Sequence, residues 1–490
     1  MAEGLEQSPF FVKAVKDGDI VVADAPKFSL ESYINEYSGK TRLYRLAHIS
    51  WRSTYLCLDA ISAAITESKR VGDVHFYLSA MELLQKLELP SAMIAKLPKD
   101  IQSGIDVAWV EKQTRTIKAE TDRLEAELRT YKNNLIKESI RMGNEELGKH
   151  YYNIGDLPNA AKAYGRMRDY CTTQKHIADM TLRLIFVSIA QRNWNSVQSW
   201  CTKLHTVTLR PEERERIDPI EMVCQGLSSL STGNYGHAAE EFLRVNPSYV
   251  NGEPQAGIVF QKQVMTGNDV AVYGGLCALA SMDRKELQSR VLNNSNFRQF
   301  LELEPHIRRA ITAFVGSKYT TCLQILDSYR VDYVLDIHLY RHFDVIYDRV
   351  RSKSIVQYFI PFSVVTFTEM EKAFPPRGGK GIQDELVGMI QSGLLDARID
   401  IPKKLLVAPK KNPRAEVQAS AVNMSKAYER NLRLRLVRMN MLNAGLQVQA
   451  PKSAKQGGYD IAGLVDDNYS SAPSARVVGG GRKAKWDGSR

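Results

Sequence analysis

The sequence has no long uninterrupted hydrophobic run. Its longest uncharged and largely apolar stretch is the 13 residues Val270–Met282, which lie between Asp269 and Asp283. A helix that crosses a bilayer needs about 20 such residues, so this stretch predicts a buried core helix. Residues 1–19 lack a basic segment followed by an apolar one, and we therefore expect no secretory signal.

Cysteine is sparse and never closely paired. The six cysteines stand singly, without a CxxC spacing, and each lies in an apolar, helix-like stretch. This pattern is typical of buried free thiols in a reducing compartment. The residues concerned are Cys57, Cys171, Cys201, Cys224, Cys277 and Cys322.

Motifs for catalysis are also lacking. His338 and His342 form an HxxxH pair, but Leu339 occupies the position where a zincin helix needs its Glu. The loop Pro375–Gly381 (PPRGGKG) is not a phosphate-binding loop, because Phe374 replaces the first Gly and no Ser or Thr follows the Lys. No HxH precedes a suitably spaced Asp, as an isopeptidase-type zinc site would require. We therefore expect no catalytic, metal-binding or cofactor-binding residues.

Acidic residues are scarce at the C-terminal end. Residues 403–490 hold 17 Lys or Arg and 6 Asp or Glu, and this surplus of 11 equals the formal net charge of the chain, +11. A nucleic-acid-binding domain carries its positive charge on the folded body that docks, so the basic balance is weak evidence for such a partner. Two hypotheses stay open for these charges: a solvated polar face, or steering toward an acidic protein surface or nucleic acid. On the last predicted helix they are Arg430, Arg433, Arg435 and Arg438.

From Phe28 onward, apolar residues recur at helical three- and four-residue steps for more than 300 residues. Within this region a small residue, an alanine and an aromatic residue recur at fixed offsets. The small residue lets the first helix of a hairpin approach the second, and the aromatic residue fills the gap. We predict degenerate tetratricopeptide-like repeats in a right-handed α-solenoid that binds other proteins. The repeated sets are Gly148, Ala160, Tyr164 and Gly226, Ala238, Phe242, with Trp194, Val197 and Cys201 midway.

A long helix is predicted from Ile117 to Met142, where Leu124, Leu128 and Leu135 share one stripe. Its other faces are rich in Glu, Lys and Arg. One interpretation is a solvated amphipathic helix that links two helical sections, and the other is a dimerising coiled coil. The stripe lasts under four heptads, which favours the first.

After Asn246-Pro247 the spacing changes and shorter helices follow. Residues 354–408 then read as helix, loop, helix and hairpin, the order of a winged helix. A long helix follows, and residues 447–490 are predicted to be a disordered basic tail. The predicted helices are Ala271–Ala280, Arg284–Leu292, Phe297–Glu302, His306–Val315, Tyr319–Ser328, Leu335–Arg351, Phe367–Phe374 and Ile382–Ile390, and the predicted strands are Leu394–Ile399 and Leu405–Val407.

Winged helices often bind DNA, but this one has an unsuitable recognition helix. Ile382–Ile390 carries Asp384 and Glu385 and no basic residue, so phosphates would repel it. Residues 354–408 hold six basic and six acidic side chains. A protein-binding winged helix is therefore favoured over a nucleic-acid-binding one.

Helical repeats followed by a winged helix and a closing helix resemble the PCI-domain proteins. These are scaffold subunits of the proteasome lid, the COP-nine signalosome and a translation initiation factor. Over residues 28–446 the motifs are similar to those of the signalosome's subunit-one family, with a proteasome-lid paralogue as the alternative. They are Leu30–Tyr33 (LESY), Tyr37–Gly39 (YSG), Arg45-Leu46, Ile136–Arg141 (IKESIR), Gly155–Leu157 (GDL), Arg168–Cys171 (RDYC), Tyr273–Ala280 (YGGLCALA), Phe300–Pro305 (FLELEP), Gln357–Phe359 (QYF) and Ala397–Asp400 (ARID).

The resemblance implies a mainly α-helical protein with several parts. We expect a flexible arm at 1–27, a helical section at 28–106, a long helix and repeats at 107–246, a PCI domain at 247–408 and a bundle helix at 409–446. Within the PCI domain the helical part would be 247–353 and the winged helix 354–408.

The resemblance also implies a non-catalytic scaffold in a complex that removes the ubiquitin-like modifier Nedd-eight from cullins, in cytoplasm and nucleus. The zinc isopeptidase site would lie on a different subunit. Expected partners are other signalosome subunits, with cullin-RING ligase components as further candidates, and neither membrane nor nucleic acid. In the family, winged-helix sheets join edge to edge and C-terminal helices form a bundle, and exposed strand edges and apolar stripes suit both modes. The expected sheet-edge residues are Leu394, Ala397, Arg398, Ile399, Asp400, Leu405, Leu406 and Val407, and the expected bundle residues are Val417, Ala421, Met424, Tyr428, Leu432, Leu436, Met439 and Leu442.

Overall fold

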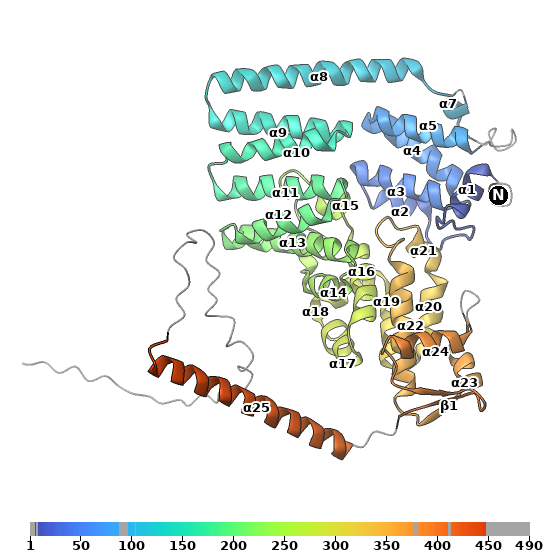
Figure 1. Cartoon of the computed structure of the whole chain (residues 1–490). Helices are drawn as coiled ribbons and strands as arrows, with labels where there is room; N and C mark the ends of the chain where they lie inside the picture. The colour runs from blue at the N-terminus through green and yellow to red at the C-terminus, as the bar shows by residue number, and fades with distance from the viewer. Residues whose placement is uncertain are drawn as a thin grey trace, which may run out of the picture. The chain divides into compact units, whose positions relative to one another are not determined.

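The computed structural model describes residues 5, 8–87, 97–102, 104–376, 381–409 and 413–446. The chain divides into two units, Met1–Pro409 and Lys410–Arg490, which are described separately. The predicted tail and most of the PPRGGKG loop lie outside the described residues. Stacked helices make up most of the first unit, together with one small sheet, and the mainly α-helical fold class is confirmed (Figure 1).

The elements fall into consecutive groups along the chain. The N-terminal helices are α1 (Pro9–Lys16), α2 (Leu30–Asn35), α3 (Gly39–Arg52), α4 (Cys57–Val71), α5 (Val74–Lys86) and α7 (Lys99–Gln102). The next are α8 (Val107–Asn133), α9 (Lys137–Ile154), α10 (Leu157–Arg166), η1 (Met167–Tyr170), α11 (Gln174–Ala190), α12 (Trp194–Thr206), α13 (Pro211–Ser231) and α14 (Tyr235–Arg244). Then follow η2 (Pro247–Tyr249), α15 (Phe260–Gln263), α16 (Gly267–Ser281), α17 (Arg284–Glu286), η3 (Leu287–Leu292), α18 (Ser295–Leu303), α19 (Pro305–Val315), α20 (Tyr319–Ser328), α21 (Arg330–Val334) and α22 (Phe343–Phe359). The last elements are β1 (Val364–Thr366), α23 (Phe367–Ala373), α24 (Ile382–Gln391), β2 (Arg398–Asp400), β3 (Leu405–Val407) and α25 (Pro413–Asn443).

Glycines set the close spacing of the repeat hairpins. A Cβ atom on Gly148 in α9 would lie 2.5 Å from the Tyr164 ring of α10, and one on Gly226 in α13 would lie 2.6 Å from the Phe242 ring of α14. Such contacts are shorter than atoms tolerate, so only glycine lets these helices approach. The packing predicted from the repeat is confirmed at both hairpins.

The long helix predicted from Ile117 to Met142 is wrong, because the chain reverses within it. Helix α8 ends at Asn133, and α9 begins at Lys137. Between them Leu135 has a positive φ of 55° and an exposed side chain. After the reversal α9 packs on α8, with Gly143 placed so that an added Cβ would lie 3.1 Å from the Tyr131 ring. Leu124 and Leu128 of α8 form a small core with Ile140 and Leu147 of α9, whereas Leu135 and Met142 of the predicted stripe are exposed.

The predicted helix Leu335–Arg351 is wrong in its first half. Residues 335–342 form turns, and α22 begins at Phe343. One carboxylate oxygen of Asp336 accepts hydrogen bonds from the backbone N–H groups of His338 and Leu339, at 2.8 and 3.0 Å. Asp side chains that bind backbone N–H groups in this way favour turns over helix. The HxxxH pair therefore does not lie on one helix.

The sequence predicts a flexible arm over residues 1–27, but the described part of this segment packs into a core cluster. Phe11 in α1 is 1% exposed and belongs to a core cluster with Cys57 and Tyr77. Val22 forms an isolated bridge with Ser53. A large aromatic side chain at this position stabilises the fold by burial, which a pattern of helical steps does not indicate.

Helix α16 is the buried core helix predicted at Val270–Met282. Thr266 and Asp269 close a capping box at its start. Within the described residues, no helix has both the length and the apolar character needed to cross a membrane. The cysteines are free, and five of the six are buried, with Cys171 partly exposed. Burial raises the pKa of the Cys57 thiol to about 12, so it stays protonated and unreactive.

Candidate protein interaction surfaces

The N-terminal helices are joined to α16 and to the turn before α22 by a buried polar network around Arg45. This side chain is 1% exposed, and its guanidinium donates to Asp336 at 2.7 Å and to Asp269 at 3.0 Å. The hydroxyl of Tyr37 donates to Asp269 at 2.8 Å, and that of Tyr273 donates to Asp336 at 2.8 Å. The network thus fixes α3 against α16 and the turn before α22.

Burial would make these charges costly unless they were paired. Burial favours deprotonation of Arg45, but the carboxylates, Asp269 first, outweigh it and raise the Arg45 pKa well above its ordinary value. Burial would likewise raise the pKa of Asp336, but Arg45 and His338 lower it to about 2. For Asp269 the effect of burial is larger than that of Arg45, and the Asp269 pKa is raised. Arg45 and Asp336 are therefore the permanently charged pair at the centre of the network.

Sequence reasoning found only half of this network. Arg45, Tyr37 and Tyr273 belong to the motifs named from the sequence, but no partner was assigned to them. Asp269 was seen only as the charge that ends an apolar run, and Asp336 was missed. Its spacing to His338 and Leu339 is the turn signal that could have indicated it.

The winged helix contains a three-stranded sheet in the order β1-β3-β2, with both pairs antiparallel. The prediction of two strands was incomplete, since β1 precedes the first helix of the module. The predicted strand Leu394–Ile399 is replaced by Arg398–Asp400, because Leu395 and Ala397 turn into the core, with 4% and 8% exposure. Arg351 of α22 holds α24 in place through an ion pair with Glu385 at 2.8 Å.

The expectation that both predicted strands offer unpaired edges is wrong for β3. Leu405–Val407 pairs with β1 on one side and with β2 on the other, so its backbone groups are used within the sheet. Leu406 is fully buried. The two edges are β1 and β2, and exposed apolar side chains near them are Ile360, Phe362, Val364, Leu394 and Ile401.

Helix α25 is 31 residues long and its apolar side chains are exposed along its whole length. Val417 is 69% exposed and Leu432 is 41% exposed. Exposed large apolar side chains in such number are typical of an interaction surface. The predicted stripe consists of Val417, Ala421, Met424, Tyr428, Leu432, Leu436, Met439 and Leu442, and every one of them is exposed.

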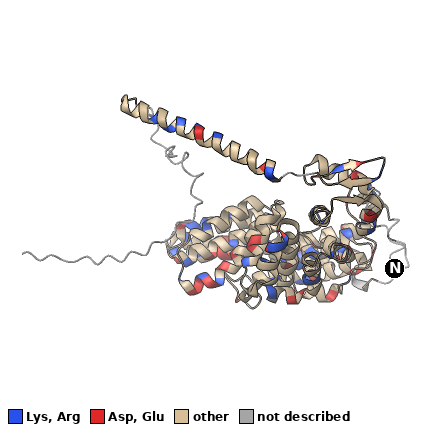
Figure 2. Cartoon of the chain, turned by 90° about the horizontal axis from the view of Figure 1, so that it is seen from below, with Lys and Arg blue, Asp and Glu red and all other residues tan. Residues whose placement is uncertain are grey.

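The opposite side of α25 is not purely polar. Leu434 follows Leu432 by two residues, which is about 200° around a helix. Val437 and Met441 continue from Leu434 at steps of three and four, so they form a second apolar strip on that side. Arg435 lies seven residues after Tyr428 and falls on the first stripe, so the hypothesis of a basic face opposite the stripe is wrong for this residue. Basic residues are distributed along α25 (Figure 2).

Both histidines of the HxxxH pair have ring or hydroxyl partners. His338 lies edge-on to Trp194 and Tyr273, with ring centroids 6.0 and 6.2 Å away. His342 lies 3.1 Å from the Tyr235 hydroxyl. In the part of the chain that the structure describes, no group of three or more His, Cys, Asp or Glu side chains is placed to hold a metal ion.

Comparisons with known proteins agree with this architecture. The family model of the PCI domain matches residues 326–410, and that of 26S proteasome subunit RPN7 matches residues 106–290. COP9 signalosome complex subunit 1 of Emericella nidulans is 50% identical over 438 residues, which cover 87% of this chain and 84% of the relative. Its counterpart in Arabidopsis thaliana is 37% identical, covering 84% and 89%. The 26S proteasome non-ATPase regulatory subunit 6 of Caenorhabditis elegans is 22% identical, covering 61% and 72%.

Stacked helices that lead into a winged helix with a PCI-domain match define a PCI-domain scaffold protein. Within this class, the chain belongs to the family of COP9 signalosome subunit 1.

Proposed function

We propose that the protein is a non-catalytic scaffold subunit of the COP9 signalosome. Through assembly of that complex it serves the removal of the ubiquitin-like modifier from cullins, in cytoplasm and nucleus. The identity of 50% to a signalosome subunit 1 over most of the chain supports the assignment. The exposed apolar residues of α25 support a role in assembly, because an isolated helix of this kind gains stability only from apolar partners.

Two surfaces would bind other subunits. The stripe from Val417 to Leu442 would pack in a bundle with helices of other subunits. The edge strands β1 and β2 would pair with strands of neighbouring winged helices, since edge backbone groups readily accept another strand. Arg398 and Asp400 on β2 would then lie at the subunit contact.

A role in the proteasome lid is less well supported. The regulatory subunit 6 of the proteasome is 22% identical and the signalosome relative 50%. Nucleic-acid binding is also disfavoured, because α24 presents Asp384 and its Glu385 is already paired with Arg351. Retention of a labelled duplex at low salt would revive that alternative.

The assembly role is tested by replacing Leu432 and Leu436 with Asp in the full chain and purifying it with its partner subunits. We expect co-purification to fall at least tenfold. The matched control is Ser420→Asp with Asn440→Asp, which adds the same charge to α25 away from the stripe. Unchanged co-purification of the Leu432→Asp, Leu436→Asp variant would show that α25 is not a bundle helix.

A further inference from the structure

A cavity of about 820 Å³ lies within the first unit, where the N-terminal helices meet the turns of the repeat hairpins. Helices α3, α4 and α5 form one side of it. The end of α9, the turn between α11 and α12 and the turn before α22 form the other side. None of the described lining residues belongs to the winged helix or to α25, so this cavity, the Arg192 cavity, is separate from the surfaces proposed for assembly.

Most charged side chains of the Arg192 cavity are already engaged. Lys40 forms an ion pair with Asp73 at 2.6 Å, and Arg52 forms one with Asp19 at 2.9 Å. The carboxylate of Asp156 caps α10, where it accepts hydrogen bonds from a backbone N–H at 3.2 Å and from a side-chain amide at 2.7 Å. These groups hold the wall together.

Two arginines of the lining remain. Arg192 and Arg341 are exposed, and among the described residues neither has a carboxylate partner. Burial lowers the pKa of His48 to about 4, so this lining ring is neutral at pH 7. The described lining holds four Lys or Arg and two Asp, a surplus of two positive charges. The cavity therefore favours an anionic ligand.

Arg192 occupies a position where the other two hairpins have glycine. Gly155, Arg192 and Gly233 each follow the first helix of a repeat hairpin, and their φ angles are 101°, 56° and 82°. In all three turns the N–H of the next residue donates to the carbonyl oxygen five positions before it, at 2.9 to 3.0 Å. Glycine adopts this left-handed conformation without strain, whereas a side chain adds a steric cost. The turn is thus better served by glycine, and the arginine instead places a guanidinium in the cavity wall.

The rest of the wall is largely aromatic and aliphatic. Tyr44 and Phe76 lie edge to face with ring centroids 6.2 Å apart, and Trp51 is 53% exposed. Leu83 and Ile154 add aliphatic side chains. A small inorganic anion would gain nothing from these groups. A polypeptide can place an apolar side chain on them and a carboxylate on an arginine, and aromatic residues and arginine are enriched at protein interfaces.

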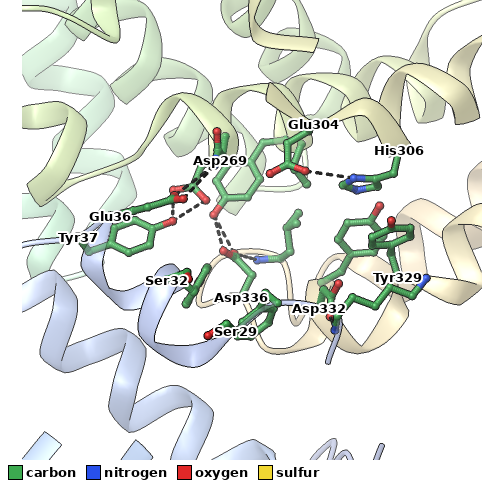
Figure 3. A pocket seen from close by; sticks show the side chains of 18 residues that line it. Ser29, Ser32, Glu36, Tyr37, Asp269, Glu304, His306, Tyr329, Asp332 and Asp336 are labelled. Carbon is green, nitrogen blue, oxygen red and sulfur yellow. Dashed lines mark hydrogen bonds and ion pairs between the residues drawn. The ribbon is translucent and has the colours of Figure 1, made fainter. Parts of the chain in front are cut away.

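A second cavity provides a contrast in charge. It has a volume of about 390 Å³ and lies beside the Arg45 network, and Figure 3 shows Asp269 and Asp336 in its wall. Its lining holds five carboxylates and one lysine, Lys27. An acidic ligand would be repelled there, so its binding distinguishes the Arg192 cavity from this acidic cavity.

We propose that the Arg192 cavity binds an acidic segment of a partner polypeptide. Carboxylates of the segment accept hydrogen bonds from Arg192 and Arg341, whose guanidinium donors match the geometry of a carboxylate. An adjacent aromatic side chain packs against Tyr44, Trp51 and Phe76. The volume lies within the range of about 300–1,000 Å³ for ligand pockets, so a few residues of the segment fit. This contact is independent of α25 and of the sheet edges.

The experiment uses the full chain and the probe N-acetyl-Gly-Asp-Phe-Asp-Gly-amide, with the Asn-Phe-Asn peptide as its neutral isostere. Binding is measured by calorimetry or ligand-detected NMR at pH 7.5 and low salt. We expect the acidic peptide to bind at least tenfold more tightly than the neutral one, and replacement of its Phe by Gly should weaken binding at least threefold. Equal binding of the acidic and neutral peptides, or of the Phe and Gly peptides, would overturn the proposal.

Variants locate the binding in this cavity. Arg192→Gly removes the guanidinium and suits the positive φ, so it should weaken binding at least fivefold while melting at or above the wild-type temperature. Arg341→Gln should also weaken binding at least fivefold, whereas the control Arg298→Gln, on α18 outside the lining, should leave it unchanged. Unchanged binding by Arg192→Gly would show that Arg192 serves the turn alone and would overturn the proposal.

Two further measurements exclude other sites and ligands. Glu36→Gln, in the acidic cavity, should leave peptide binding unchanged, and a gain in affinity would place the peptide there and contradict the proposal. Inorganic phosphate at the concentration of the peptide should not displace it. Complete displacement would make the Arg192 cavity a site for a small anion and overturn the assignment to a polypeptide.

A last variant distinguishes the source of the acidic segment. The tail of this chain contains Asp460, Asp466 and Asp467. Replacing all three with Asn should leave peptide binding unchanged if the segment comes from a partner. A fivefold gain in peptide affinity would instead show that the tail of this chain competes for the cavity and would overturn the assignment to a partner.

Discussion

Arg45 and Asp336 are 291 positions apart in the sequence, yet a guanidinium nitrogen of Arg45 lies 2.7 Å from an Asp336 carboxylate oxygen in the protein interior. Asp336 also organises the turn before α22 through two backbone N–H groups. This one carboxylate therefore links the N-terminal helices to the PCI helices.

Removing the arginine should destabilise the protein strongly. Arg45→Met leaves Asp269 and Asp336 buried without their cation, and breaking a buried pair in this way costs about 3 kcal/mol. We expect a clearly lower urea midpoint and faster proteolysis of residues 28–106. The control Arg290→Met removes an exposed ion pair with Glu240 and should leave the midpoint unchanged. A wild-type midpoint for Arg45→Met would contradict the role of this network.

The repeat hairpins provide a matched pair of glycine substitutions. Gly148→Ala forces a methyl group to within 2.5 Å of the Tyr164 ring and should destabilise the protein by about 2 kcal/mol through overpacking. Gly165→Ala, in α10 of the same hairpin, meets no atom within 4 Å and should be neutral or slightly stabilising. Thermal melting of both variants checks this. Equal effects would mean that the close approach at Gly148 does not determine hairpin packing.

His338 should make the protein less stable in mild acid. Burial lowers its pKa from an ordinary value of 6.5 to about 3, so between these values the unfolded chain binds a proton that the native state excludes. Stability therefore falls as pH drops below about 6.5, and by pH 5 the loss from this group should reach about 2 kcal/mol. His338→Phe keeps the ring and removes the proton site. The difference in melting temperature between pH 7 and pH 5 should be smaller for this variant than for wild type.

The contrast between predicted and observed elements has a physical explanation. The glycine and aromatic offsets were informative because close packing within a hairpin depends on residues near each other in sequence. The reversal at Leu135 was missed because apolar residues continue at helical steps on both sides of the turn, although Leu135 and Met142 are themselves exposed. The partner of Arg45 could not be found from spacing, since a pairing across 291 positions leaves no periodic signal.

The stripe on α25 was predicted better than the sheet edge, because the stripe depends on residues near each other in sequence and the edge does not. The stripe on α25 follows from helical steps alone, and in the structure all its residues lie on one helix with exposed side chains. The sheet edge was misplaced because strand order is a tertiary property. Until β1 at Val364–Thr366 is known, nothing in the sequence indicates that β3 is central.

The second apolar strip of α25 leads to a prediction about its place in the assembled complex. A helix at the rim of a bundle needs one apolar face, whereas a helix that is apolar on opposite sides is buried between neighbours. Leu434→Asp with Met441→Asp should therefore reduce co-purification with partner subunits about as much as Leu432→Asp with Leu436→Asp. The control Ser420→Asp with Asn440→Asp, at two positions that lie between the strips, should have little effect. If the Leu434 and Met441 substitutions are tolerated, α25 contacts its partners through the first stripe alone and lies at the rim of the bundle.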